Sequence, residues 1–492
     1  MSILEKIVES KKREIERLHA QHDIRELQEL VAQNHPNAPP RFYQAFAETR
    51  ARGEHFFIAE FKRKSPSEGW LDHDADLPPQ VCAYAQAGAS AISVLTDEPF
   101  FGGSYADLKL AAQTLHLLPS STLHPPPLLL QKDFILNPIQ IYLAKLHGAD
   151  IILLIAAILE PEQLGYLKKI AESLGMGVLV EVHDEAELAK IQHLDFPVLG
   201  VNNRDLKTFR TALNRVNVLK KQAGGRFVVA ESGIRDYRDF QAVRHADGFL
   251  IGTGLMRAEK LPTRFEAHFQ GRGKFLFKAC GIRTPEMLTA FSDGLTSSQP
   301  VTKNSPDFIG LNFSPVSRRR VDAETCEILK NSQVSNAVAV FYKNTETDIR
   351  ETLEKYPLHA VQLYAHEVSP EFVRSLKQRV MLAMSIRETA DLQQLEPFAA
   401  DVDFFILDGA TPGSGQRVGA AIPAGFPYPF LLAGGLNEEN LEVILSYENC
   451  LGADIASGIE TDGQVDVGRI HRIAERLSDL KEIVEKKIYL AK

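Results

Sequence analysis

Short apolar runs rich in β-branched residues recur along the whole chain, and each one ends in polar or glycine residues. The runs are apolar throughout rather than alternating, which is typical of strands buried on both faces of a parallel sheet. The pattern predicts eight parallel strands in the first half of the chain. These runs occupy residues 56–62, 91–96, 128–133, 151–155, 177–182, 197–203, 227–232 and 248–252.

Helical patterns separate these runs. Residues 184–193 open with Asp184 and Glu187, whose spacing is that of an N-cap residue and the third helical residue. Residues 138–147 begin with a proline, which is favoured in the first turn of a helix. Strands that alternate with helices indicate β/α units.

The same series starts again in the second half. Eight β/α units are the number in a closed (β/α)8 barrel, so we predict an α/β protein of two tandem barrels. An open doubly wound sheet is the alternative, although it usually has fewer strands per domain. The runs of this half occupy residues 275–280, 308–313, 337–342, 360–364, 380–385, 403–408, 430–435 and 453–458.

The domain boundaries follow from these runs. We expect the first barrel within residues 1–270, a linker at residues 271–274 and the second barrel at residues 275–492. Residues 1–50 precede the first strand and are expected to form a helical extension that either covers the bottom of the barrel or forms a lid over its top. At the start of this extension, Leu4, Ile7, Ile15 and Leu18 follow helical spacing and form one apolar face. Lys11 falls at the same spacing.

Composition narrows the class of protein. The chain is 44% hydrophobic and 24% charged, as in ordinary globular proteins, which excludes disordered, collagen-like and membrane-embedded chains. The 55 basic and 64 acidic side chains give a net charge of −9 without a basic stripe, so no nucleic-acid partner is expected. The longest apolar run, residues 151–159, is too short to cross a bilayer, so no membrane partner is expected either.

The cysteines and the N-terminal residues indicate the compartment. Four cysteines in so long a chain cannot form a disulfide framework, and none is spaced as a CxxC metal knuckle. The N-terminal residues are charged and lack the apolar core of a signal peptide, so we expect a cytoplasmic protein. Because neither HExxH nor a GxGxxG after a strand occurs, we expect no metal and no other cofactor.

Reactive groups of barrel enzymes lie at the carboxyl ends of the strands. A salt bridge at the barrel rim could explain any one charged residue there, but so many charges in one mouth cost more desolvation than stability requires. The seventh and eighth runs end in AESG and IGTG, whose glycines let backbone N–H groups approach a phosphate. In the first half, the polar strand ends are Glu60, Lys62, Lys132, Glu181, Asn202, Arg204, Glu231 and Ser232.

Several of these segments resemble indole-3-glycerol phosphate synthase: EFKRKSPS (60–67), QKDF (131–134), VNNRDL (201–206), AESGI (230–234) and LIGTGLM (250–256). The resemblance implies that 1-(2-carboxyphenylamino)-1-deoxyribulose 5-phosphate closes into an indole with loss of carbon dioxide and water. It also implies catalytic roles, with Lys132 as the acid, Glu181 as its partner acid or base, and Lys62 as a second candidate acid. The resemblance further implies residues that hold the substrate hydroxyls and orient the lysines, namely Glu60, Asn202, Arg204, Glu231 and Ser232. It implies that the phosphate is bound by Ser65, Gly233, Gly252 and Thr253.

The second half offers a lone thiol, Cys280, at the end of its first strand and Asp408 at the end of its sixth. The thiol is either a small buried hydrophobe or the base of an acid–base pair with Asp408. Arg319 lies in a basic triplet that is either a solvated patch or a clamp for a carboxylate. Backbone amides in three glycine-rich segments suit a phosphate, at Gly413, Gly415, Gly434, Gly435, Ser457 and Gly458.

KACGI, VQL, FILDG, GSGQR, LLAGGLN and SGIE resemble phosphoribosylanthranilate isomerase, which performs an Amadori rearrangement. The resemblance implies that Cys280 is the base, Asp408 the acid and Arg319 the clamp for the anthranilate carboxylate, with Gln362 also binding substrate. The family usually shows VQLHG where this chain has Tyr364 and Ala365, a departure that bears on local packing and rate but not on the catalytic pair.

Together the two resemblances imply one chain with consecutive steps of tryptophan biosynthesis on phosphorylated small molecules, the isomerase being C-terminal. Because both barrels belong to one chain, we expect a monomer. Two alternatives are weighed against this. Histidine-pathway isomerases would be expected to use paired aspartates instead of Cys280 and Asp408. Alternatively, the second barrel is impaired and serves only to stabilise the first, for which Tyr364 is the sole support.

Overall fold

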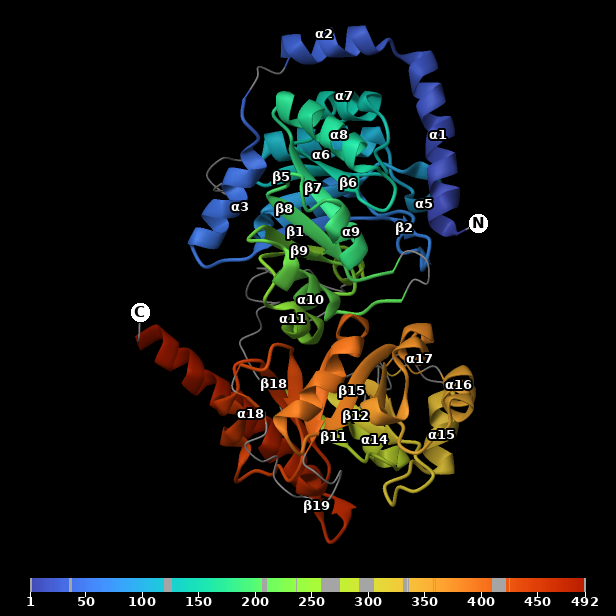
Figure 1. The fold of residues 1–492 in the computed structure, drawn as a ribbon, viewed down its shortest axis with the longest axis vertical. Coiled ribbons are helices and arrows are strands. Elements are labelled where there is room, and N and C mark those ends of the chain that lie inside the picture. The colour runs from blue at the N-terminus through green and yellow to red at the C-terminus, as the bar shows by residue number, and fades with distance from the viewer. Residues whose placement is uncertain are drawn as a thin grey trace. The chain divides into compact units, whose positions relative to one another are not determined.

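The computed structural model describes residues 2–34, 38–118, 126–205, 210–235, 237–257, 275–291, 305–330, 334, 336–356, 358, 360–408, 422–423 and 425–490. The chain divides into two compact units, Met1–Phe209 with Val216–Gly271, and Arg210–Arg215 with Arg272–Lys492. Each unit contains one closed barrel of parallel strands with helices outside it (Figure 1). The predicted α/β class with two tandem barrels is confirmed, and the open doubly wound sheet is excluded. The predicted linker lies outside the described residues.

The first barrel closes where its first strand pairs with its last. Phe56 at the start of β1 pairs with Gly248 of β10, and all neighbouring strands run parallel. The strands agree with the predicted runs to within two residues at either end. They are β1 (Phe56–Phe61), β4 (Ala91–Leu95), β5 (Leu128–Lys132), β6 (Ile151–Ile155), β7 (Gly177–Val182), β8 (Val198–Asn202), β9 (Phe227–Glu231) and β10 (Gly248–Ile251).

The predicted helix starts are also found. Asp184 accepts a hydrogen bond from the backbone N–H of Glu187 at 2.8 Å, as an N-cap residue does. A short hairpin of β2 (Lys64–Ser65) and β3 (Gly69–Trp70) follows β1. The helices of this unit's barrel are α4 (Leu77–Gln86), α5 (Glu98–Phe101), α6 (Tyr105–Leu117), α7 (Pro138–Leu146), α8 (Pro161–Ser173), α9 (Glu185–Lys190), α10 (Arg215–Gln222), α11 (Tyr237–Val243) and α12 (Thr253–Met256).

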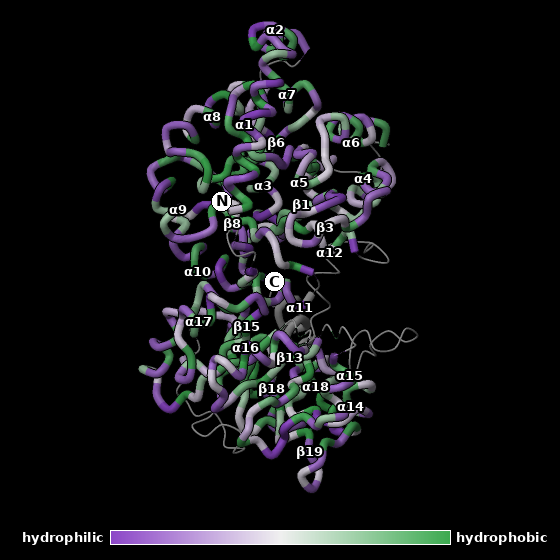
Figure 2. The backbone as a smooth tube through the Cα atoms, turned by 90° about the vertical axis from the view of Figure 1, so that its right-hand side faces the viewer, coloured by the Kyte–Doolittle hydropathy of each residue, from purple (hydrophilic) through white to green (hydrophobic). Residues whose placement is uncertain are grey.

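The N-terminal extension forms α1 (Ile3–Gln21), α2 (Ile24–Asn34) and α3 (Arg41–Ala51). The ring of Phe46 in α3 stacks on those of Phe56 and Phe227 at centroid distances of 4.5 and 5.0 Å. Phe56 and Phe227 begin strands β1 and β9, so α3 covers the bottom of the barrel. Hydrophobic and hydrophilic residues mix along α2 at the top of Figure 2, and its buried residues face α7.

Helix α1 reaches the opposite end of the same barrel. The Lys11 ammonium lies 3.1 Å from a carboxylate oxygen of Asp97 and 2.7 Å from one of Asp133. Asp97 follows β4 and Asp133 follows β5, so both carboxylates mark the carboxyl ends of strands. The two interpretations of the extension therefore apply to different helices, with α3 at the bottom and α1 in contact with the top edge.

The second barrel closes by pairing β11 with β18. Its last strand begins three residues earlier than predicted, because Gly452 lies inside the strand instead of before it. A Cβ atom at Gly452 would collide with the backbone of Leu276 in β11, so only glycine fits there. The strands are β11 (Leu276–Cys280), β12 (Phe308–Asn312), β13 (Ala337–Val340), β14 (Ala360–Tyr364), β15 (Arg379–Ser385), β16 (Phe404–Asp408), β17 (Phe430–Leu432) and β18 (Cys450–Ile455).

Several of the helical elements around this barrel are 3₁₀ helices. None of the helices in the described part of the chain is long and apolar enough to cross a membrane. A small hairpin of β19 (Glu460–Thr461) and β20 (Gln464–Val465) follows the last strand. The helical elements are α14 (Pro285–Phe291), α15 (Ala323–Lys330), α16 (Glu346–Lys355), η1 (Ala365–Glu367), α17 (Pro370–Ser375), η2 (Thr389–Asp401), η3 (Leu441–Ser446), η4 (Ser457–Ile459) and α18 (Val467–Leu490).

Candidate functional sites

The mouth of the first barrel brings together charged residues from four strand ends. The Lys132 ammonium at the end of β5 lies 3.1 Å from Glu181 Oε2 on β7 and 3.5 Å from Glu231 Oε2 on β9. Lys62 Nζ donates to Glu60 Oε1 on β1 at 2.7 Å. All three carboxylates are buried. The structure thus gathers five of the predicted residues into one cluster.

Burial and neighbouring charges shift the pKa values of Lys132, Glu181 and Glu231 in different directions. Burial lowers the pKa of Lys132, but the carboxylates of Glu181, Glu231 and Glu60 outweigh it and raise that pKa above its usual range. Burial raises the pKa of Glu181, yet Lys132, His183 and Asn202 bring it below normal. Burial raises the pKa of Glu231. Lys132 is therefore a charged acid next to an ionised carboxylate, which is the arrangement of an acid and base pair.

Asn202 is the last residue of β8 at the same barrel mouth, and Arg204 lies two residues further along the chain. Asn202 Nδ2 donates to Glu181 Oε1 at 3.2 Å, and its Oδ1 accepts from the backbone N–H of Arg204. The Arg204 guanidinium donates to Ser67 Oγ at 2.7 Å and lies 3.4 Å from Glu68. Asn202 thus orients a candidate catalytic carboxylate, whereas Arg204 is held by the β2–β3 hairpin.

The predicted phosphate residues lie at three neighbouring places. The Ser65 hydroxyl is buried and has no hydrogen-bond partner among the described residues. Ser232 and Gly233 have consecutive positive φ angles of 64° and 84°, a backbone shape that turns N–H groups toward one point. Gly252 directly precedes α12, which begins at Thr253. A Cβ atom at Gly252 would collide with the Glu60 carboxylate, so this glycine also makes room for a charged side chain.

Two buried cations near this site escaped the sequence reasoning. His183 lies 3.3 Å from Glu181 Oε1 and directly follows β7 in the sequence. Lys11 is completely buried among Asp97, Asp133 and Glu14. The signal for Lys11 was its apolar-face spacing in α1, since a lysine at such a position needs a buried partner.

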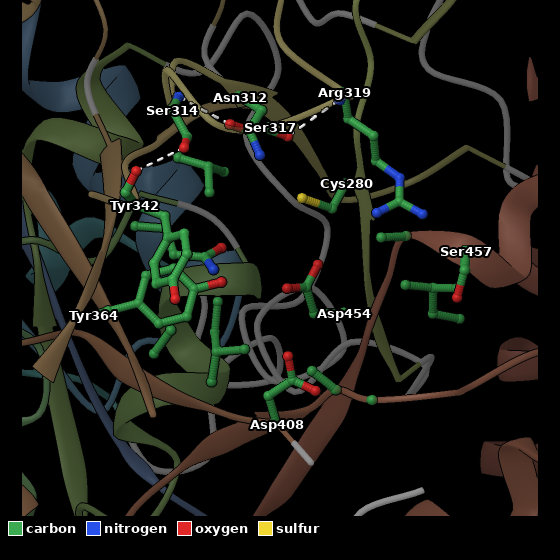
Figure 3. A pocket seen from close by; sticks show the side chains of 18 of the residues that line it. Cys280, Asn312, Ser314, Ser317, Arg319, Tyr342, Tyr364, Asp408, Asp454 and Ser457 are labelled. Carbon is green, nitrogen blue, oxygen red and sulfur yellow. Dashed lines mark hydrogen bonds between the residues drawn. The ribbon is translucent and has the colours of Figure 1, made fainter. Parts of the chain in front are cut away.

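A pocket of about 270 Å³ opens at the carboxyl ends of the second barrel's strands. Cys280 and Asp408 both line it, and Figure 3 shows Asp454 between them in this view. Gln362, Gly434, Gly435 and Ser457 contribute to the same lining. Gly458 does not line the pocket, and Gly413 and Gly415 lie outside the described residues.

The Cys280 thiol has a charged pair beside it that the sequence reasoning did not assign. Lys278 is fully buried on β11, and its ammonium donates to Asp454 Oδ1 on β18 at 2.9 Å. Burial raises the pKa of the thiol, and the Lys278 cation counteracts part of that rise. Because residues two apart on a strand face the same side, the KAC segment already implied that lysine and thiol point the same way.

The guanidinium of Arg319 is held in a bidentate ion pair. It donates to the two carboxylate oxygens of Glu460 at 2.6 and 2.9 Å. Tyr364, where the chain departs from the family pattern, lines the pocket with Tyr342, and their ring centroids are 4.9 Å apart. The departure thus places an aromatic pair on one side of the pocket and leaves Cys280 and Asp408 on its wall.

Comparison with known proteins finds a family match for each half of the chain. Residues 4–267 match the family model of indole-3-glycerol phosphate synthase, and residues 287–476 match that of N-(5'-phosphoribosyl)anthranilate isomerase. Among solved structures, the isomerase from Thermus thermophilus is similar, with 24% identity, a TM-score of 0.34 and coverage of 42% of this chain and 99% of that one.

Curated relatives contain both halves in the same order. The tryptophan biosynthesis protein TrpCF of Salmonella typhi is 34% identical over 435 residues, which cover 87% of this chain and 89% of that protein. TrpCF of Buchnera aphidicola subsp. Diuraphis noxia is 30% identical over 489 residues, or 97% and 99% of the two chains. The chain therefore belongs to the indole-3-glycerol phosphate synthase family in its first half and to the phosphoribosylanthranilate isomerase family in its second, as a bifunctional enzyme of tryptophan biosynthesis.

Proposed function

We propose that the first barrel forms indole-3-glycerol phosphate with Lys132 as the acid and Glu181 as its partner. The ion pair of 3.1 Å between Lys132 and Glu181, buried in the barrel mouth, carries this proposal. Lys132 protonates the carbonyl oxygen during ring closure, regains a proton from solvent and then protonates the departing hydroxyl, and Glu181 removes the proton that restores aromaticity. Lys62, held by Glu60, is the cation for the carboxylate that leaves as carbon dioxide.

In the second barrel, we propose that Asp408 protonates the ribose ring oxygen as the ring opens and that the Cys280 thiolate removes the C2′ proton. The Lys278 ammonium next to Cys280 favours the thiolate, which supports the thiol as the base. Arg319 binds the anthranilate carboxylate, so the substrate replaces or shares Glu460 as its partner. A pocket lined by both reacting groups argues against a merely structural second barrel.

The remaining predicted residues bind the two phosphates. In the first barrel these are Ser65, Ser232, Gly233, Gly252 and Thr253, and the free Ser65 hydroxyl supports a ligand there. In the second barrel, Gly434 and Gly435 have φ angles of 89° and 67° and line the pocket, which supports backbone capture of an anion with help from Ser457. Gln362 is buried in the same pocket wall.

By reaction class, the first activity is that of a carbon–carbon lyase and the second that of an intramolecular oxidoreductase. We further propose that the chain acts in the cytoplasm as a monomer. None of the four cysteines, all of which the structure describes, forms a disulfide bond, which suits a reducing compartment. Each candidate site is built from residues of one chain, so a second copy is not needed. Light scattering that gives a mass of 54.7 kDa checks the monomer, and a doubled mass overturns it.

Paired substitutions test the assignment of residues to reactions. Lys132→Ala should lower the synthase rate by about 10²–10⁴-fold and leave the isomerase rate unchanged, because a positioned acid is lost from one site only. Cys280→Ser or Asp408→Asn should do the reverse. Fluorescence assays of each reaction on the purified chain measure both rates. Indole formation that survives in Lys132→Ala would remove Lys132 from its role.

A further inference from the structure

His183 is a buried side chain in the first barrel mouth for which the proposed reaction has no use. It directly follows β7 and is 7% exposed. Its Nε2 lies 3.3 Å from Glu181 Oε1, and its Nδ1 lies 3.1 Å from Glu187 Oε2 in α9. The backbone N–H of His183 also donates to Glu187 Oε2 at 2.9 Å. The imidazole thus bridges two carboxylates, one of them in the candidate site.

These two contacts decide the charge of the ring. Burial lowers the pKa of His183, but the negative charges of Glu181 and Glu187 and the hydrogen bond to Glu187 outweigh burial and raise that pKa to about 10. The ring is therefore a cation at neutral pH. The other groups that face Glu181 are Lys132 from β5, Asn202 from β8 and Glu231 from β9.

The contacts divide the Glu181 carboxylate between two cations. Oε2 faces Lys132, and Oε1 faces His183 together with the amide of Asn202. With partners on both oxygens, the carboxylate is held in one orientation. Without the imidazolium, Lys132 alone would have to balance both Glu181 and Glu231.

We propose that His183 is a positioning residue for indole formation: a cation anchored by Glu187 that holds the Glu181 carboxylate ionised and aimed at Lys132. This inference rests on the role proposed above for Glu181. His183 acts through Glu181 and does not touch the reacting atoms, so its loss should change the pH dependence of kcat more than KM.

The first experiment measures synthase kcat against pH for His183→Gln, which keeps a hydrogen-bond donor of similar size and removes the charge. Loss of a cation within 4 Å raises the pKa of Glu181, so the acid limb of the profile should move upward by about 1–3 pH units. The isomerase profile of the same chain should not change. An unshifted acid limb overturns the proposal, whether or not kcat falls, because a fall alone is what a merely structural histidine would produce.

The second experiment uses Glu187→Gln, which leaves His183 in place but removes one of its two carboxylates. The pKa of His183 should then fall, so that the ring loses its charge at a lower pH. A pH titration of the His183 ring, followed by its ¹⁵N resonances, should therefore move to lower pH in Glu187→Gln. A titration at its original position would show that Glu187 does not support the cation.

The matched control is His147→Gln in the same unit. The His147 ring lies 2.7 Å from the carbonyl oxygen of Leu143, a neutral backbone group outside the barrel mouth, so both limbs should keep their positions. Ring ¹⁵N resonances of the full chain report the charge on His183 without any assay, with His183→Gln assigning the signal. Two protonated ring nitrogens at pH 8 are expected, and a neutral ring overturns the proposal.

The role of Glu181 is tested separately by Glu181→Gln. If this variant keeps full synthase activity, the role proposed for Glu181 is wrong, and the functional part of the inference fails with it. If Glu181→Gln loses activity while His183→Gln keeps the wild-type profile, the inference about His183 alone is wrong.

Discussion

At the scale of single residues, both barrel mouths depend on charges that are almost completely buried. Glu181 and Glu231 are 2% and 1% exposed, and Lys278 is 0% exposed. Removing one member of such a pair leaves the other charged and without compensation, which costs far more than the loss of a surface pair. The burial of these groups therefore makes single substitutions at the sites informative.

Arg319→Lys should raise the isomerase KM by about 10–100-fold, because a lysine cannot make the two parallel hydrogen bonds that guanidinium offers a carboxylate. Steady-state kinetics of the isomerase measure the effect. The control is Arg320→Lys, in the same basic triplet, whose side chain is exposed and does not line the pocket, so that it should be replaceable at little cost. Equal effects of the two substitutions would contradict the clamp.

His55 should make the first barrel less stable in acid. Burial lowers its pKa from 6.5 to about 4, aided by Arg50, so the folded protein holds the ring neutral. In the unfolded chain the His55 ring binds a proton below pH 6.5. The free energy of unfolding therefore decreases as the pH falls from 6.5 toward 4. His55→Gln should reduce the loss of unfolding free energy between pH 7 and pH 5 by about 2 kcal/mol.

Urea unfolding at the two pH values checks this prediction for His55. The control is His19→Gln, on an exposed position near the end of α1. A loss of stability in acid that is the same in wild type and in His55→Gln would show that the buried ring does not contribute.

At the scale of elements, Lys11 connects the N-terminal extension to the strands of the catalytic barrel. Burial lowers the pKa of Lys11, but Asp133, Asp97 and Glu14 raise it well above its usual range, so the side chain is charged. Asp133 also accepts a hydrogen bond from Thr96 Oγ1, and the Thr96 backbone N–H donates to the Lys132 carbonyl at 3.1 Å. Helix α1 is therefore joined to the backbone that presents Lys132.

Lys11→Met should lower the unfolding free energy of the first barrel by about 3–5 kcal/mol, because Asp97 and Asp133 lose their buried cation. Urea unfolding followed by circular dichroism measures the change. The neighbouring Lys12 is exposed on the same helix, and Lys12→Met should have little effect. A Lys11→Met protein as stable as Lys12→Met would mean that α1 is held by its apolar residues alone.

At the scale of the whole molecule, each candidate site is complete within its own unit. The residues around Lys132 belong to the first unit and those around Cys280 to the second. The second unit also includes Arg210–Arg215, a segment that follows β8 and ends at the first residue of α10, so this unit is not one continuous stretch of chain.

A mixture of Lys132→Ala and Cys280→Ser chains should convert phosphoribosylanthranilate to indole-3-glycerol phosphate, because each chain keeps one complete site. Fluorescence follows product formation, which is expected in the mixture and not with either variant alone. If the mixture makes no product while each variant retains its remaining activity, the intermediate does not pass through solution between chains.

Much of this architecture was predictable from local patterns. The apolar runs placed the strands of both barrels because burial on both faces of a parallel sheet leaves a continuous apolar signature. The strand ends likewise indicated Lys132, Glu181, Cys280 and Asp408, since the barrel fold collects such ends in one mouth. The error at the last strand arose at Gly452, where glycine serves a close backbone approach and not a turn.

The partners of the buried charges required the folded chain. Lys278 and Asp454 are 176 positions apart, and nothing local to either marks the other. His183 and Lys11 likewise have partners that only strand order and helix placement bring close. Sequence pattern alone was sufficient for the strands and the fold, because these depend on local burial, and it indicated the candidate reacting residues because they lie at strand ends. Which cation neutralises which carboxylate was decided by tertiary contacts, because a buried charge is stabilised only by what the fold places beside it.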